Sequence, residues 1–347
     1  MDVLTYSDEK WPYSDELKSL GINVFSCNNH RNPISLLKSI RAINDTHGPY
    51  NAIHGHEMFQ NGLVLAIAWL LGIKVRISHA HNSDQAVKPI FPRRAYNFLM
   101  RWFIFVFGTN LLSVSDAAGK KLYGDKIWAR SKRAEIAHCG LDFSSYRSHL
   151  HIRGAVRDSI GIPHDAIVMA HVGRFVYQKN HEMLLRIASE VMKNLPNAWL
   201  ICVGEGDSRS RIENMADELG IKERCKFLGA RNDVPQIILD CCDIFVLPSR
   251  FEGLGLVIVE AMAAGKPSLV SDVVPNEADV IPDLIFRMPL DKSPKIWADK
   301  VMEILNSSQS FIGIDCLSVI EASQHAISHS YEKMRGVYGC APNRGLG

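Results

Sequence analysis

The sequence predicts an α/β protein of the doubly wound kind, built as two domains. Its 347 residues, 47% of them hydrophobic, are enough to bury two cores of ordinary domain size. Short apolar runs alternate with helix-like patterns along the chain, which is typical of parallel sheets with helical crossovers. One run, residues 243–247 (DIFVL), is almost entirely apolar and therefore predicts a strand that is covered on both faces.

In the first half of the chain the predicted strands are residues 22–26, 52–54, 75–78, 110–114 and 134–137. The predicted helices are residues 33–44, 62–73 and 115–123, the last with Ser115 as its N-cap. The longest apolar run, residues 62–73, is well short of the roughly 20 residues that span a bilayer, so we expect a core helix there.

The second half repeats the pattern more regularly. Its predicted strands are residues 167–172, 198–203, 225–228, 243–247 and 268–271. Its predicted helices are residues 207–219, 254–264, 291–305 and 328–338. A polar helix and loop at residues 151–162 predict the crossing between the two domains.

The net charge and the cysteine pattern indicate which partners and which cellular compartment to expect. The formal net charge is +2 and no long block of like charge occurs, so the sequence gives no reason to expect nucleic acid as a partner. Eight cysteines occur without a C-x-x-C pair, and the polar start MDVLTYSDEK does not resemble a signal peptide. We therefore expect reduced, mostly buried thiols in a cytoplasmic protein.

A loop with two glycines joins the strand at 243–247 to the helix at 254–264. Gly253 and Gly255 would let backbone N–H groups face an anion at the carboxyl edge of the sheet. Glu252 and Glu260 stand eight residues apart, and each carboxylate could accept two hydrogen bonds from a vicinal diol. The plainer alternative is that Glu260 caps a polar pocket and Glu252 is solvated.

A second cluster of polar residues follows the strand at 167–172. Gly173 allows close approach of the backbone to a ligand, and Arg174 and Lys179 come directly after it. A guanidinium and an ammonium group together could clamp a diphosphate and neutralise charge that builds on a leaving group.

Two H-x-H pairs also stand at predicted strand ends, His54 with His56 and His79 with His81. The pairs could be metal ligands of a metallohydrolase, although the acids nearest to them are only Glu57 and Asp84. Any one of these histidines could instead be a hydrogen-bonded structural residue.

Three of these stretches resemble glycosyltransferase family 4, whose members are retaining enzymes with the GT-B fold. They are residues 78–83 (SHAHNS), 171–181 (HVGRFVYQKNH) and 241–267, which contains the E-x7-E pattern and the tail EAMAAGKP. Within that family, the chain resembles the glycosyltransferases of bacterial exopolysaccharide and capsule biosynthesis. The resemblance implies two Rossmann-like domains that face a cleft: an acceptor-side domain at 1–153, a nucleotide-sugar domain at 154–325, and a final helix, 326–347, that crosses back.

The resemblance also implies roles for individual residues. Glu252 would contact the donor sugar, Glu260 the ribose, Arg174 and Lys179 the donor phosphates, and His81, rather than His79, would lie by the reactive carbon. His54 and His56 would pack in the protein interior or contact the site residues without touching the ligand. The catalytic set would be His81, Arg174, Lys179 and Glu252, and the donor-binding set Gly173, Arg174, Lys179, Gly204, Gly229, Val234, Glu252, Gly253, Leu254, Gly255 and Glu260.

The implied reaction moves a sugar from a nucleotide-diphosphate donor, a UDP-sugar in preference to a GDP-sugar, to a glycan acceptor that we expect to be lipid-linked. No D-x-D occurs in the chain, so we expect transfer without a metal ion or prosthetic group. Front-face transfer is favoured over double displacement, because no carboxylate is evidently placed as a nucleophile. The chain starts at a pattern like the family's second strand, which predicts that about thirty residues, one βα unit, are missing.

Residues 88–107 (KPIFPRRAYNFLMRWFIFVF) combine four basic residues with many aromatic ones. Such a helix can lie on an anionic membrane surface, here the cytoplasmic face of the inner membrane. Alternatively, its apolar face can pack on the sheet. The two arrangements are compatible with each other.

Two rival functions remain open from sequence. A missing first unit could leave a protein that binds nucleotide sugars without catalysis, and the same fold serves epimerases that act on a nucleotide sugar without a separate acceptor.

Overall fold

The fold is described from a computed structural model, which describes residues 1–7, 13–82, 91–151, 154–307 and 315–339. The chain divides into two compact units. The first comprises Met1–Ala80, Pro89–Leu112 and Leu122–Glu135, and the second His81–Lys88, Ser113–Lys121 and Ile136–Gly347. Each unit is treated by itself below.

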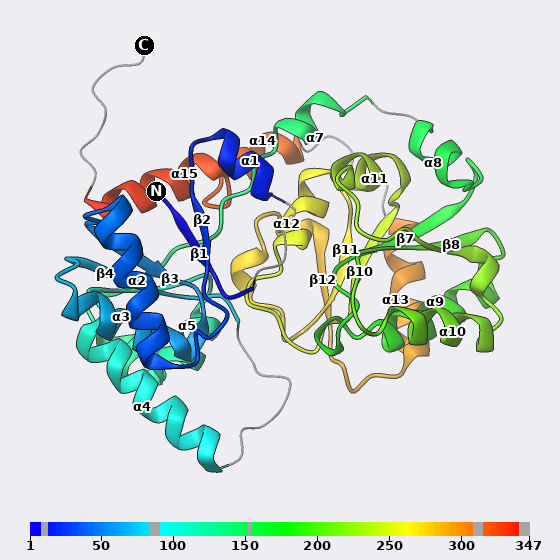
Figure 1. The fold of residues 1–347 in the computed structure, drawn as a ribbon. Coiled ribbons are helices and arrows are strands. Elements are labelled where there is room, and N and C mark those ends of the chain that lie inside the picture. Colours follow the sequence, from blue (N-terminus) through cyan, green and yellow to red (C-terminus); the bar gives the residue numbers. More distant parts are fainter. Residues whose placement is uncertain (8–12, 83–90, 152–153, 308–314, 340–347) are drawn as a thin grey trace. The chain divides into compact units, whose positions relative to one another are not determined.

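The second unit is built on a six-stranded sheet whose paired strands are all parallel. Its strand order is β12-β11-β10-β7-β8-β9 (Figure 1). The chain therefore builds outward from β7 to one edge and from β10 to the other, which is the strand order of a Rossmann fold. These strands are β7 (Ile167–Val172), β8 (Ala198–Val203), β9 (Cys225–Phe227), β10 (Ile244–Leu247), β11 (Ser268–Ser271) and β12 (Ile285–Met288).

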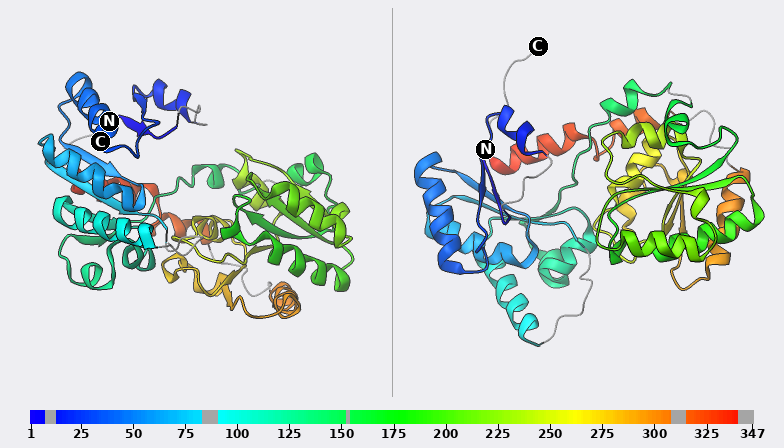
Figure 2. Two further views of the ribbon diagram at one scale, coloured as in Figure 1. Left: turned by 60° about the horizontal axis from the view of Figure 1, so that its bottom comes forward. Right: turned by 45° about the vertical axis from the view of Figure 1, so that its right-hand side comes forward.

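Helices cover both faces of this sheet, as the views of Figures 1 and 2 show. The helices of this part of the chain are α7 (Ser144–Ser148), α8 (Ala155–Ile160), α9 (His181–Asn194), α10 (Arg209–Glu218), α11 (Val234–Cys241), α12 (Leu256–Ala263), α13 (Pro294–Ser307), α14 (Cys316–Glu321) and α15 (Ile327–Tyr338).

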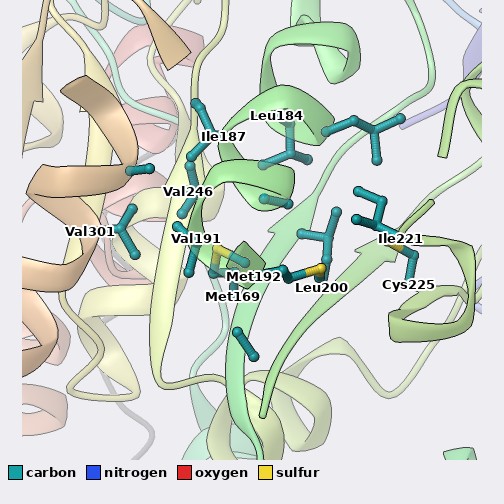
Figure 3. Close-up of a cluster of buried hydrophobic side chains, with 14 of the residues drawn as sticks. Met169, Leu184, Ile187, Val191, Met192, Leu200, Ile221, Cys225, Val246 and Val301 are labelled. Carbon is teal, nitrogen blue, oxygen red and sulfur yellow. The ribbon is translucent and has the colours of Figure 1, made fainter. Parts of the chain in front are cut away.

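Alternate residues of β8 pack into two different hydrophobic clusters, one on each face of the sheet. Leu200 packs in the cluster formed with α9, α10 and α13, part of which Figure 3 shows. Ile201 and Val203 pack in a second cluster with Ile237 of α11 and Val156 of α8. A strand that is apolar at every position is buried on both faces. This explains why residues 243–247, which include the fully buried strand β10, form an almost continuous apolar run.

The part of the chain before residue 137 contains two sheets, β1-β2 and β3-β4-β5-β6. The strands are β1 (Val3–Thr5), β2 (Val24–Ser26), β3 (Ala52–Gly55), β4 (Val75–Ala80), β5 (Asn110–Ser113) and β6 (Ala134–Ile136), and the pairs β1-β2 and β3-β4 are parallel. The helices are α1 (Ser14–Ser19), α2 (Pro33–His47), α3 (Asn61–Leu70), α4 (Phe91–Phe107), α5 (Asp116–Tyr123) and α6 (Asp125–Arg130).

The predicted α/β class is confirmed, and the predicted elements lie within a few residues of the observed ones. Ser115 does cap α5, because its hydroxyl accepts a hydrogen bond from the Ala118 N–H at 3.2 Å. The edge strand β12 was not predicted, because its half-buried residues IFRM give no continuous apolar run. The seven described cysteines are free thiols, and six of them are buried. Within the described residues, no helix combines the length and apolar character needed to cross a membrane.

The loop after β7 lies directly against the end of β8. The Gly173 N–H donates to the Val203 carbonyl at 2.9 Å, and the Gly204 N–H donates to the Gly229 carbonyl at 2.8 Å. Gly204 has φ of +140°, and a Cβ added there would lie 2.2 Å from the Gly173 oxygen. Only glycine fits this position, for reasons of both backbone angle and space.

We expect Gly204→Ala to lower the free energy of unfolding by about 3 kcal/mol or more, because it combines backbone strain with a clash that only backbone movement can relieve. Gly220→Ala is the matched control: its φ is also positive (+68°), but a Cβ there meets nothing within 4 Å. It should cost about 1 kcal/mol. Urea unfolding of both variants measures the difference, and equal losses would contradict the proposed close contact.

Candidate functional site

The second unit contains a pocket of about 350 Å³ where β7 and β10 lie side by side. The chain leaves these two strands toward opposite edges of the sheet, and such a point leaves a crevice beyond the carboxyl ends of the strands. The volume is within the range of small-molecule sites. The lining residues are His81, Asn82, Val114, Cys139, Val172, Gly173, Arg174, Gln178, Lys179, Glu252, Gly253, Leu254, Gly255, Leu256 and Val257.

A short turn after β7 carries the two cations. Lys179 is held because the next residue, Asn180, adopts a left-handed backbone (φ +55°) and donates from Nδ2 to the Pro248 carbonyl at 3.0 Å. The preceding residue is tied to the same loop, since the Arg250 N–H donates to the Gln178 carbonyl at 2.8 Å. Asparagine tolerates the left-handed region better than other non-glycine residues, which makes this turn possible. Arg174, in contrast, is exposed at the pocket.

Glu252 joins the turn after β7 to the loop after β10. Its carboxylate accepts from Lys179 Nζ at 2.7 Å and from Gln178 Nε2 at 3.1 Å, and the residue is only 4% exposed. A buried carboxylate is stable only when it is paired and hydrogen-bonded, and here both conditions are met. Carboxylate oxygens offer about four acceptor positions, so Glu252 can still accept hydrogen bonds from a ligand.

The backbone of the loop after β10 approaches the segment after β4 closely. A Cβ at Gly253 would lie 1.8 Å from the His81 carbonyl oxygen, and the Gly253 carbonyl accepts a hydrogen bond from the Ser115 hydroxyl. Gly255 has φ of +87° and precedes the first turn of α12. The first N–H groups of a helix point toward its N-terminal end, here the pocket end of α12, where an anion is stabilised by the helix dipole.

His81 lines the pocket, and the Cys139 sulfur lies 3.8 Å from its Nδ1. His79, the other candidate of this pair, is 4% exposed and contacts His54 within the first unit. His54, His56 and His79 therefore belong to the first unit, whereas His81 belongs to the second.

Four of the expected donor-binding residues do not line this pocket. Gly204 packs against the Gly173 carbonyl, and Gly229 accepts the hydrogen bond from the Gly204 N–H. Val234 is the first residue of α11 and packs on the hydrophobic cluster that contains Ile237. Glu260 lies on α12 one turn beyond the lining residues Leu256 and Val257, on the same helix face. The pocket also uses Gln178, a residue that the sequence did not single out, because its contact with Glu252 depends on the turn at Asn180.

Glu260 has an unusual environment for an acid. Burial raises the pKa of its carboxyl group to about 7, while the hydrogen bond from the Tyr146 hydroxyl, at 3.5 Å, acts in the opposite direction. Because the folded-state pKa is raised above the usual 4.5, stability is lost as the pH rises from about 4.5 to about 7.

We expect Glu260→Gln to raise the melting temperature at pH 8 and to leave it nearly unchanged at pH 4.5. The shift in pKa corresponds to at most about 3 kcal/mol at 1.36 kcal/mol per unit. The control Glu223→Gln, at an exposed position, should change neither value. The explanation fails if the stabilisation by Glu260→Gln is the same at both pH values.

Comparison with known proteins places this site in context. Residues 153–313 match the family model described as glycosyl transferases group 1. The chain is 27% identical over 344 residues to a putative glycosyltransferase EpsF of Bacillus subtilis, covering 96% of this chain and 89% of that protein. It is 25% identical to the UDP-Gal:alpha-D-GlcNAc-diphosphoundecaprenol alpha-1,3-galactosyltransferase of Escherichia coli, covering 88% and 83%.

Among solved structures, the Anabaena protein Alr3699/HepE in complex with UDP and glucose aligns with a TM-score of 0.77 at 17% sequence identity. The alignment covers 98% of this chain and 92% of that one. The similarity confirms the predicted GT-B fold with two Rossmann-like domains. Most residues that line the pocket at the β7–β10 switch point lie within residues 153–313, the segment that matches the glycosyl transferases group 1 model, and His81, Asn82, Val114 and Cys139 lie before it.

Proposed function

We propose that the protein is a retaining glycosyltransferase that transfers a sugar from a UDP-sugar to a lipid-linked glycan in surface polysaccharide biosynthesis. The observation that carries the proposal is the pocket at the β7–β10 switch point, where Arg174, Lys179, Glu252 and His81 meet. The names of the relatives support the substrate classes: one structural neighbour is complexed with UDP and glucose, and one relative acts on a diphosphoundecaprenol acceptor.

In this proposal the donor diphosphate binds across the start of α12. The N–H groups after Gly255 and the charges of Arg174 and Lys179 balance its negative charge. Because no D-x-D occurs in the chain, these groups do the work that a bridging metal ion does elsewhere, and transfer is metal-independent. Lys179 is already fixed by Glu252, so little reorganisation is needed when charge develops on the leaving phosphate.

Glu252 accepts hydrogen bonds from the donor sugar, and His81 faces the same sugar from the segment after β4. The bond between the sugar C1 and the phosphate oxygen breaks while the acceptor oxygen bonds to C1 on the same face. The acceptor proton moves to the leaving phosphate oxygen. His81 orients the sugar and stabilises the positive charge that develops on it.

Glu260 would bind the ribose hydroxyls, as part of a donor site that continues along α12 from the pocket. Its place one helical turn past Leu256 supports this, because a turn advances about 5.4 Å along the axis. The domain boundaries at residues 153 and 325, the final crossing helix and the cytoplasmic location remain parts of the same proposal.

We expect Arg174→Gln to reduce transfer from a UDP-sugar by 10²–10³-fold, because it removes a charge that stabilises the leaving diphosphate. The matched control is Arg186→Gln, an exposed arginine on α9 outside the pocket, which should keep full activity. Transfer is measured to a lipid-linked acceptor, and NMR of the product gives the configuration of the new linkage. Normal turnover by Arg174→Gln, or an inverted linkage, would contradict the mechanism. Binding without any transfer would favour the non-catalytic alternative.

The proposed acceptor is bound to a membrane, and α4 offers a surface that fits one. Three large apolar side chains, Phe91, Phe98 and Trp102, are 82%, 72% and 52% exposed and recur at helical spacing along one face. Asn97, Met100 and Ile104, on the opposite face, are buried, where α4 lies beside α3 (Figure 1). The described helix carries arginines and no acidic residue; Lys88, at the start of the predicted stretch, lies outside the described residues.

We expect the protein to bind vesicles that contain phosphatidylglycerol and to bind pure phosphatidylcholine weakly, because arginines on α4 favour anionic lipid. The double variant Phe98→Glu with Trp102→Glu should bind at least tenfold more weakly, as measured by vesicle co-sedimentation. Ile296→Glu, at an exposed position of α13, is the control and should bind normally. Equal binding by all three proteins would exclude α4 as the contact surface.

A further inference from the structure

Three histidines of the first unit lie on one face of the sheet at the ends of two neighbouring strands. In the parallel pair β3-β4, His54 is opposite Ile77 and Gly55 is opposite Ser78. Continuing this register places His56 opposite His79. Because side chains alternate between faces along a strand, His54, His56 and His79 all point to the same side.

The three imidazoles are close enough to share one ion. The His54 Nε2 and His79 Nδ1 atoms are 3.2 Å apart, and the ring of His56 lies 4.2 Å from that of His54 and 5.6 Å from that of His79, centre to centre. One nitrogen from each of the three rings lies within 4.8 Å of the others. Two nitrogens bound tetrahedrally to zinc at 2.0–2.1 Å are about 3.3 Å apart. One pair already has this separation.

Burial differs among the three in a way that suits an ion site. His79 is buried, His54 is half-buried and His56 is exposed. The buried ring of His79 and the half-buried ring of His54 would supply two ligands, and the exposed ring of His56, which already lies against His54, would supply the third.

The chemistry of the cluster selects the kind of ion. Imidazole nitrogen binds Zn²⁺, Cu²⁺ and Ni²⁺ well, whereas Mg²⁺ and Ca²⁺ prefer oxygen ligands. We propose that His54, His56 and His79 form a binding site for a divalent transition-metal ion of the zinc type. The ion would join the ends of β3 and β4. The site uses none of the pocket residues, so it goes beyond the proposed transferase function and stands or falls independently of it.

This assignment differs from the metallohydrolase alternative that the sequence left open. That alternative would use both H-x-H pairs, but His81 lines the pocket of the second unit and does not join the cluster. The grouped residues are three neutral ligands without a carboxylate to act as a base. The ion is therefore assigned a structural role.

Binding of ZnCl₂ and CoCl₂ to the full chain, stripped of metal with a chelator and held at pH 7.5, tests the site. We expect one equivalent of Zn²⁺ to bind in competition with a chromogenic chelator, Mg²⁺ in excess not to displace it, and Co²⁺ to give a visible d–d absorption band. His56→Gln should weaken Zn²⁺ binding at least tenfold and abolish the Co²⁺ band. Because His56 is exposed, the variant should fold normally.

His329→Gln, at an exposed histidine of α15 outside the cluster, is the matched control and should bind as the unchanged protein does. His54→Gln provides a second test of the same site and should weaken binding similarly. The proposal is overturned if the unchanged protein binds no equivalent of Zn²⁺, or if His56→Gln and His54→Gln bind it as tightly as His329→Gln.

Discussion

The ion pair between Lys179 and Glu252 is the interaction on which the architecture of the pocket depends. It connects the turn after β7 with the loop after β10, which are 73 residues apart in sequence. Both side chains are largely removed from solvent, so neither charge would be stable there alone. The sheet makes the pair possible, because β7 and β10 are hydrogen-bonded neighbours whose carboxyl ends open to the same side.

Close backbone packing supports the same pair from both sides. Gly204 lets the end of β8 lie against the Gly173 carbonyl, and Gly173 in turn leaves room for the Lys179 side chain, whose Cε would be 3.0 Å from an added Cβ. On the other side, Gly253 allows contact with the His81 backbone. Glycines in a ligand-binding motif can thus have a structural role. They allow close contacts between backbone segments, and these contacts position the charged side chains of the pocket.

Much of the second unit could be predicted from sequence, because a strand buried on both faces leaves a continuous apolar run and a helix end leaves glycine or proline. The meeting of Lys179 and Glu252 was also predictable in outline, since carboxyl ends of parallel strands share one edge. The role of Gln178 was not, because it depends on the left-handed backbone at Asn180. The grouping of His54 and His56 with His79 was equally hidden, since the register of β3 against β4 cannot be read from the two strands separately.

The raised pKa of Glu260 bears on how a donor would bind along α12. A carboxyl group with a pKa of about 7 is close to half protonated at neutral pH, and only the ionised form accepts hydrogen bonds with both oxygens. Two hydroxyl donors from a ribose would stabilise the ionised form and so lower that pKa. Binding of a nucleotide at this position would therefore release a fraction of a proton, and the loss of stability that Glu260 causes in the ligand-free protein would be offset when the donor binds. In the proposed donor site, the ribose hydroxyls would give the Glu260 carboxylate hydrogen-bond donors in addition to the Tyr146 hydroxyl.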